Sequence, residues 1–121
     1  MSYFELQEFE DPTLPGSGVN MDVNFLRMLN DARKISGIPY KITSGYRSIE
    51  HNKTVGGVIN SSHLTGKAAD IAVGGGSQRY VIINSLIKAG FCRLGIAKTF
   101  IHCDNDSLEQ GGTKPNSIWT Y

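Results

Sequence analysis

A carboxylate in the middle of a short apolar run is the feature that most restricts how this chain can fold. The run Ala68-Ala69-Asp70-Ile71-Ala72-Val73 has the length and composition of a buried β-strand. A carboxylate buried there without partners would be costly, so a cation or several hydrogen-bond donors must lie against Asp70. Two interpretations follow: a structural aspartate that accepts hydrogen bonds from nearby amides, or a metal ligand.

Two of the three histidines, His63 and His102, can complete a metal site with Asp70. Two imidazoles and one carboxylate supply three protein ligands and leave a fourth position open, as hydrolytic zinc sites require. The two-residue period of a strand places His102 and Asp104 on one face and Cys103 on the other. On this prediction Cys103 points into the core and His102 points toward a cleft.

The third histidine, His51, lies in the polar segment Glu50-His51-Asn52 and is expected to be solvated instead of ligating a metal. The two cysteines are too few for a disulfide scaffold or for an all-cysteine zinc site. We expect both Cys92 and Cys103 to be buried thiols.

Length and charge exclude several classes of protein. With 121 residues the chain is long enough for one compact domain, over residues 1–121. Its net charge of +1 gives no broad positive field, so no nucleic-acid partner is expected. The apolar runs are only a few residues long, so no membrane span is expected. The first ten residues contain no basic residue, which predicts cytoplasmic synthesis without a signal peptide.

The hydrophobic pattern predicts an α+β domain. Residues 1–18 are expected to be irregular because prolines and glycines interrupt them. The next element expected is a helix capped by Asn20, with Asp22 in its first turn and Gly37 at its end. A strand over 39–44, a loop over 45–66 and the buried strand over 68–73 follow it. The remaining elements expected are a helix capped by Ser77 and running to Ala89, a hairpin of 91–97 and 100–104, and an ordered tail.

Three stretches of the sequence resemble a known peptidase family. They are Ile42-Thr43-Ser44-Gly45-Tyr46-Arg47-Ser48, followed by Asn52 and Gly56-Gly57; a Ser-x-His-x-x-Gly-x-Ala-x-Asp string from Ser61 to Asp70; and Phe100-Ile101-His102. Together they resemble the zinc D-Ala-D-Ala carboxypeptidases, a family that includes bacterial wall peptidases and phage endolysins. The likeness extends from about residue 20 to the end of the sequence. It implies the Hedgehog/D-Ala-D-Ala peptidase fold, a small antiparallel sheet with helices packed on it and a zinc ion in an open groove.

The resemblance also implies roles for individual residues. His63, Asp70 and His102 fall on the three zinc ligands of the family. Arg47 falls on an arginine that holds the substrate or its developing oxyanion, a role that suits the fixed fork of donors on a guanidinium. Ser61 is expected to hydrogen-bond the loop backbone and to contribute to substrate binding.

One departure from the family concerns the catalytic base. Many members carry an acidic residue three positions before the last zinc histidine, where this chain has Thr99. Asp104 is the nearest candidate for the base, and it is an equally good candidate for a partner that orients His102. Glu50 and Asp106 are weaker options.

These observations predict a zinc-dependent peptidase that hydrolyses an amide bond in peptidoglycan stem peptides, as a D-Ala-D-Ala carboxypeptidase or as an endolysin-type endopeptidase. Synthesis without a leader fits a phage enzyme that reaches the cell wall at lysis. Thr99 favours an alternative, a non-catalytic module in which zinc only stabilises the fold. An iron oxygenase uses similar ligands, but the chain is short for the double-sheet barrel of such enzymes.

Overall fold

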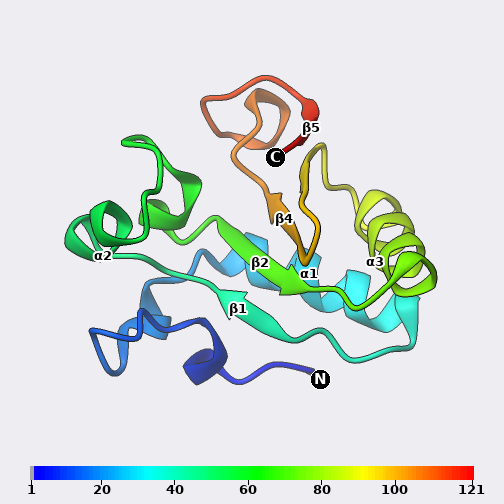
Figure 1. Cartoon of the computed structure of the whole chain (residues 1–121), viewed down its shortest axis with the longest axis horizontal. Coiled ribbons are helices and arrows are strands. Elements are labelled where there is room, and N and C mark those ends of the chain that lie inside the picture. The colour runs from blue at the N-terminus through cyan, green and yellow to red at the C-terminus, as the bar shows by residue number, and fades with distance from the viewer. Residues whose placement is uncertain (1) are drawn as a thin grey trace.

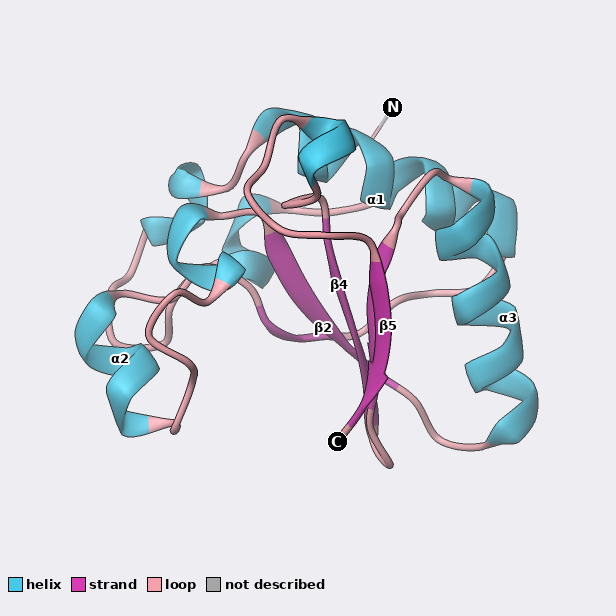
Figure 2. Cartoon of the chain, turned by 90° about the horizontal axis from the view of Figure 1, so that it is seen from above, coloured by secondary structure: helices cyan, strands magenta, loops and turns pink. Residues whose placement is uncertain are grey.

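The computed structural model describes residues 2–121, which form a five-stranded sheet with the two longer helices packed on one face (Figures 1 and 2). The helices are α1 (Val23–Ser36), α2 (Ile49–Thr54) and α3 (Gly76–Lys88). The strands are β1 (Ile42–Ser44), β2 (Ala68–Ala72), β3 (Arg93–Ile96), β4 (Phe100–Asp104) and β5 (Ser117–Thr120). The predicted α+β class is confirmed.

The sheet is mixed, with the strand order β1-β2-β4-β3-β5. Three neighbouring pairs are antiparallel, but β3 and β5 run parallel. The expectation of an antiparallel sheet is therefore wrong for this one pair. The cause is where β4 ends: Asp104 lies opposite Arg93, so the chain leaves β4 beside the start of β3. When it returns at Ser117, beside Arg93, it follows β3 in the same direction.

Strand alternation separates the sheet into an apolar face and a polar face. The apolar face packs against α1 and α3, and Cys103 is fully buried in it, as predicted. The polar face carries Asp70 and His102, which lie directly opposite each other in β2 and β4. The core of the apolar side contains Ala69, Ile71, Leu94, Ile101 and Cys103 from the sheet, Phe25, Leu29 and Ala32 from α1, and Ile82 and Leu86 from α3.

Both long helices begin at other residues than the sequence predicts. The N-cap of α1 is Asp22, whose carboxylate accepts a hydrogen bond from the Phe25 amide at 2.9 Å. Asn20 instead ends a short 3-10 helix, Ser17–Asn20. In α3 the N-cap is Gly75, so Ser77 lies inside the helix. The predicted end of α1 is confirmed, because Gly37 adopts the left-handed conformation with φ of 69°.

Residues 1–18 are expected to be irregular, and the described part of this segment, residues 2–18, is more ordered than predicted. It contains the 3-10 helix Leu6–Phe9 and the first half of a second one, and the Phe9 side chain is fully buried in the main core. The Phe9 carbonyl accepts a hydrogen bond from the Tyr46 amide at 2.8 Å. A Cβ added to Gly45 would lie 2.5 Å from the same carbonyl oxygen, so this close approach requires glycine. The N-terminal segment therefore supports the chain that leads to Arg47.

The region 45–66 is not the loop that the sequence predicts, because it contains α2 and the 3-10 helix Ser62–Thr65. Ser48 caps α2 by accepting a hydrogen bond from the His51 amide. Both helices are short and mostly polar, so they have no hydrophobic period for sequence analysis to detect. The hairpin of β3 and β4 forms as predicted. Within residues 2–121 no helix combines the length and apolar character needed to cross a membrane.

Candidate metal centre and active-site pocket

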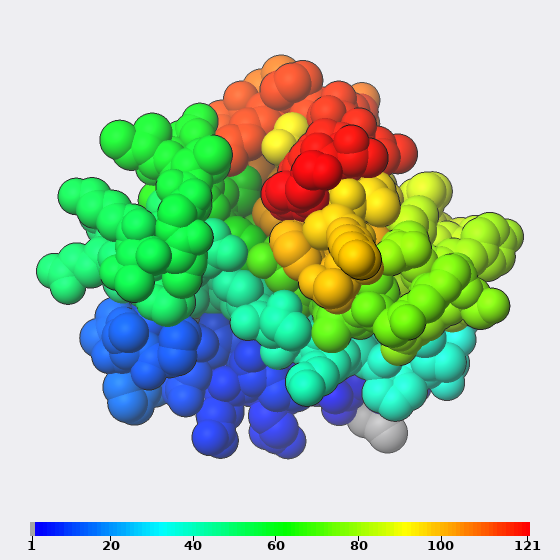
Figure 3. All heavy atoms as spheres, in the orientation of Figure 1, coloured from blue at the N-terminus to red at the C-terminus, as the bar shows by residue number. Residues whose placement is uncertain are grey.

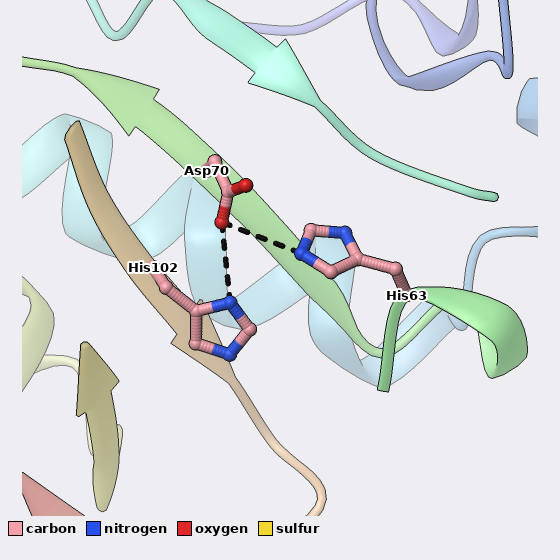
Figure 4. Close-up of side chains that lie close together, drawn as sticks. All are labelled: His63, Asp70 and His102. Carbon is pink, nitrogen blue, oxygen red and sulfur yellow. Dashed lines mark hydrogen bonds and ion pairs between the residues drawn. The ribbon is translucent and has the colours of Figure 1, made fainter. Parts of the chain in front are cut away.

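The three residues with metal-ligand character converge at one point, although they lie far apart in the sequence (Figure 4). Asp70 comes from the middle of β2 and His102 from the opposite position of β4. His63 comes from the 3-10 helix that precedes β2. All three side chains are buried, and one ligand atom from each lies within 4.8 Å of the others.

Each histidine turns one ring nitrogen toward Asp70 and the other toward a separate acceptor. His63 Nε2 lies 3.3 Å from Asp70 Oδ1, and His102 Nδ1 lies 3.1 Å from the same oxygen. His63 Nδ1 lies 2.7 Å from the Gly45 carbonyl, and His102 Nε2 lies 2.7 Å from Asp104 Oδ2. In the neutral tautomer in which the outer nitrogens donate to these acceptors, the inner nitrogens carry lone pairs, as metal ligands must.

The electrostatics of the site favour a positive charge next to Asp70. Burial alone raises the pKa of Asp70, but hydrogen bonds from His102 and His63 outweigh burial and hold the pKa of this carboxyl well below its usual range. Burial lowers the pKa of His102, but hydrogen bonds to Asp104 and Asp70 raise it above its ordinary value. Acceptors thus surround both imidazoles, and the positive charge that they stabilise can be a proton or a metal ion.

Asp104 lies on the face that the sequence predicts, and both of its oxygens have partners. Oδ2 faces His102 Nε2, while Oδ1 accepts from Arg93 Nε at 2.9 Å and from the Asp106 amide at 3.0 Å. The side chain is fully buried. These contacts favour the interpretation that Asp104 orients His102 over the interpretation that it takes a proton from water.

Arg47 follows β1 and reaches the same cluster. Its Nη2 lies 3.4 Å from Asp70 Oδ2, and its Nε donates to Ser44 Oγ at 3.0 Å. Its Nη1 donates to Asn52 Oδ1 at 3.2 Å. Three of the five N–H groups of a guanidinium are therefore engaged, which leaves two for a ligand oxygen.

Ser61 lines the pocket and also caps the 3-10 helix that carries His63. Its hydroxyl oxygen accepts a hydrogen bond from the His63 amide at 3.2 Å, which is the backbone contact that the sequence predicts. Ser61 is largely buried. Its position therefore holds His63 in place.

A pocket of about 600 Å³ opens over the His63, Asp70 and His102 cluster. Val55, Gly57 and Val58 line one side, and Trp119 and Tyr121 line the other. In Figure 3 the green segment that contains residues 50–60 and the red C-terminal segment stand on opposite sides of a hollow. The pocket is thus an open groove between two segments that are distant in the sequence.

Sequence analysis missed how the side of the pocket that contains Trp119 is formed. Asp70, His102, Gly95 and Trp119 occupy one row across β2, β4, β3 and β5. Because Gly95 has no side chain, the Trp119 ring lies over it and comes within 5.3 Å of the His102 ring, measured between centroids. The signal that could have revealed this row is the glycine in β3, since glycine inside a strand often marks a close approach.

Two cations in the pocket were also missed. Arg93 donates a hydrogen bond to Asp104, stacks over the Trp119 ring and lines the pocket. Lys114 donates to the Asn60 carbonyl at 2.7 Å and to Ser62 Oγ at 2.9 Å. Lys114 lies in a loop without a periodic pattern, so no local signal identified it.

Several other expectations can be compared with the structure. His51 lies on α2 and is not among the residues that line the pocket. Thr99 lies in the turn between β3 and β4, where its carbonyl accepts from the Val73 amide. Cys92 is only half-buried, so the expectation of two buried thiols is wrong for this residue. The reason is its position just before the first residue of β3, outside the core.

Comparison with known proteins agrees with this geometry. The family described as Peptidase M15 matches residues 3–104, which include the three residues of the candidate metal centre. No curated protein matches the chain. The family match confirms the resemblance to the D-Ala-D-Ala carboxypeptidase type of peptidase, and it covers most of the sequence. The chain belongs to the peptidase M15 family.

Proposed function

We propose that this protein is a zinc-dependent peptidase that hydrolyses an amide bond in peptidoglycan stem peptides. The observation that carries the proposal is the convergence of His63 Nε2, His102 Nδ1 and the Asp70 carboxylate beneath an open pocket. The reaction is either removal of a terminal D-Ala or cleavage within the stem, since both can use the same ligand set. Residues 1–121 act as one catalytic domain in this proposal.

The donor set fits zinc. Two neutral imidazole nitrogens and one carboxylate are typical ligands of catalytic zinc sites, which keep a further position open. The outer ring nitrogens of His63 and His102 have acceptors that fix both rings, as is usual for ligating histidines. A zinc ion held there would supply Lewis-acid chemistry, by lowering the pKa of a water and by polarising the scissile carbonyl.

Arg47 would bind the substrate at the edge of this site. Its two remaining N–H groups suit a peptide carboxylate or the oxygen that becomes negative during hydrolysis. Asp104 would keep His102 in the tautomer that leaves Nδ1 free. With the guanidinium and the imidazole held in advance, less reorganisation is needed when substrate binds.

The charge of the pocket suits an acidic substrate. Arg47, Arg93 and Lys114 line it together with the carboxylates of Asp70 and Asp104, and a bound zinc ion would add two further positive charges. Peptidoglycan stems carry several carboxylates. The apolar rims at Val58 and Trp119 would contact the methyl groups of alanine residues.

A release of the protein at phage lysis is the biological setting that we propose. In this setting the protein is made in the cytosol and reaches the wall when the inner membrane is permeabilised. Expression followed by permeabilisation of the membrane should then clear a culture. A culture that stays turbid while the purified protein cleaves muropeptides would contradict this setting alone.

A second candidate function is a non-catalytic module stabilised by zinc. The non-catalytic module is favoured because Thr99 occupies the position where many family members have their acidic residue. Among the described residues that line the pocket, the carboxylates are Asp70 and Asp104, and both are engaged. A module of this kind would bind one zinc ion and leave stem peptides intact.

Mass spectrometry of digested muropeptides distinguishes the two functions. The wild-type protein should release a defined fragment, and His63→Ala should release none because a ligand is lost. His51→Ala is the matched control, since His51 lies outside the pocket, and it should cleave as the wild type does. Zinc-loaded wild-type protein that leaves every stem peptide intact would refute the peptidase and support the module.

A further inference from the structure

The buried side chain of Asn52 is unusual for its surroundings. It belongs to α2, a helix of six residues whose other side chains are exposed or half-buried. Asn52 itself is only 3% exposed. An asparagine is seldom buried unless its polar atoms have partners, because an unpaired buried amide is costly.

Both ends of the Asn52 amide have partners, and they belong to two different parts of the candidate site. The oxygen Oδ1 accepts from Arg47 Nη1 at 3.2 Å. The nitrogen Nδ2 donates to the Val58 carbonyl at 2.8 Å, and Val58 lies on the rim of the pocket. One side chain thus joins the guanidinium to the segment that forms one side of the groove.

The neighbouring glycine shows how closely this segment approaches. The Gly57 amide donates to the Asn52 carbonyl at 2.8 Å. A Cβ added to Gly57 would lie 2.0 Å from Asn52 Oδ1 and 3.0 Å from Arg47 Nη1. The rim therefore lies directly over the contact between the amide and the guanidinium.

We infer that Asn52 is a positioning residue, which holds Arg47 toward the metal centre and fixes the rim at Val58 to it. The inference rests on the proposed function, because it takes Arg47 as the group that binds the substrate. Of the three hydrogen bonds given above for the Arg47 guanidinium, those to Ser44 and Asp70 hold one of its edges. Asn52 holds Nη1, so its loss lets the guanidinium tilt.

A double-mutant cycle tests whether Asn52 acts through Arg47. Asn52→Ala should lower kcat/KM about 10- to 100-fold, as expected for a lost hydrogen bond to a charged group. In an Arg47→Ala background the same substitution should change kcat/KM by less than about threefold. Lys53→Ala, an exposed neighbour on α2, is the matched control and should leave kcat/KM unchanged. Equal losses from Asn52→Ala in both backgrounds would overturn the inference.

A second measurement keeps the test independent of turnover. NMR of the zinc-loaded protein should show slow rotation of the Arg47 guanidinium in the wild type and faster rotation in Asn52→Ala. Asn52→Asp retains an oxygen for Arg47 and loses the donor to Val58, so it should keep the rotation slow. An Arg47 guanidinium that rotates equally in the wild type and in Asn52→Ala would refute the positioning role, whether or not the protein cleaves peptides.

If the wild-type protein cleaves no stem peptide but Arg47 loosens in Asn52→Ala, the proposed function fails and the positioning role stands. If cleavage occurs and neither Arg47 rotation nor the cycle responds to Asn52, the positioning role fails alone. Zinc content and melting temperature should be measured for every variant. If Asn52→Ala loses zinc or unfolds, Asn52→Leu, which also lacks an acceptor for Arg47 Nη1, replaces it in both measurements.

Discussion

Replacing Asp104 by asparagine separates the two interpretations of this residue. Three donors face the carboxylate: His102 Nε2, Arg93 Nε and the Asp106 amide. An asparagine has one oxygen, which can still accept from Arg93 and the Asp106 amide. Its NH2 group then faces His102 Nε2, so this nitrogen must become the acceptor. The ring proton moves to Nδ1, the nitrogen that faces Asp70.

The magnitude follows from this change of tautomer. A protonated Nδ1 cannot ligate zinc, and substitutions of partners that orient ligating histidines typically cost about 10- to 100-fold in metal affinity. A tenfold change corresponds to about 1.4 kcal/mol of binding free energy. The weaker interaction with Arg93 should also lower the free energy of unfolding by about 1 kcal/mol, because a hydrogen bond between two charged groups becomes one to a neutral amide oxygen.

Competition with a chromophoric chelator near neutral pH measures the zinc affinity of Asp104→Asn. Asp31→Asn is the matched control, since it removes the same charge from an exposed position of α1 and should leave zinc affinity unchanged. Full zinc affinity in Asp104→Asn, together with a loss of about 10²–10⁴-fold in kcat, would refute the orienting role. That result would identify Asp104 as the general base instead.

Three further predictions concern stability. The Asp11 carboxylate is buried and accepts from the Ser48 amide at 2.7 Å; burial raises its pKa, but hydrogen bonds from Thr13 and Ser48 outweigh burial and hold the pKa well below its usual value. The stabilisation by this carboxylate is therefore present above about pH 4 and is lost as the pH falls. Urea titrations should show that Asp11→Asn lowers the free energy of unfolding by about 1.5–3 kcal/mol at neutral pH and by less toward pH 2. A loss of the same size at every pH would contradict this prediction. Gly95→Ala places a Cβ 2.7 Å from Trp119 Nε1, so it should displace the indole ring and shift the tryptophan fluorescence. It should also lower the free energy of unfolding by about 1–3 kcal/mol. Unchanged fluorescence would contradict this packing. Chelation of zinc should lower the melting temperature, because a metal present at about 1,000 times its Kd stabilises the folded state by about 4 kcal/mol. A melting temperature that does not respond to chelator would count against the metal site.

The parts of the molecule that sequence analysis predicted well are those with local signals. The two-residue period around His102 predicted that His102 and Asp104 share one face of the sheet and that Cys103 lies on the other, and the structure brings Asp70 and His63 to His102. The short turn at Thr99 fixes the register of the hairpin, so the contact between Arg93 and Asp104 was also predictable in principle.

The parts that were missed depend on contacts between distant segments. The pairing of β5 with β3 places Trp119 over Gly95, and nothing near Trp119 in the sequence indicates this parallel register. Phe9 belongs to the core although prolines and glycines surround it, because the chain at Gly45 packs against its backbone. Asn52 lies in a helix too short to show an apolar period, and its burial depends on Arg47 and the rim of the pocket.

A crystal structure of the zinc-loaded protein, with anomalous scattering recorded on both sides of the zinc absorption edge, tests the central claim most directly. The account predicts one strong zinc peak at about 2.0–2.2 Å from His63 Nε2, His102 Nδ1 and an Asp70 oxygen, with a fourth position facing the pocket. A zinc ion bound by other residues, or saturating zinc that leaves these three side chains without a peak between them, would contradict it.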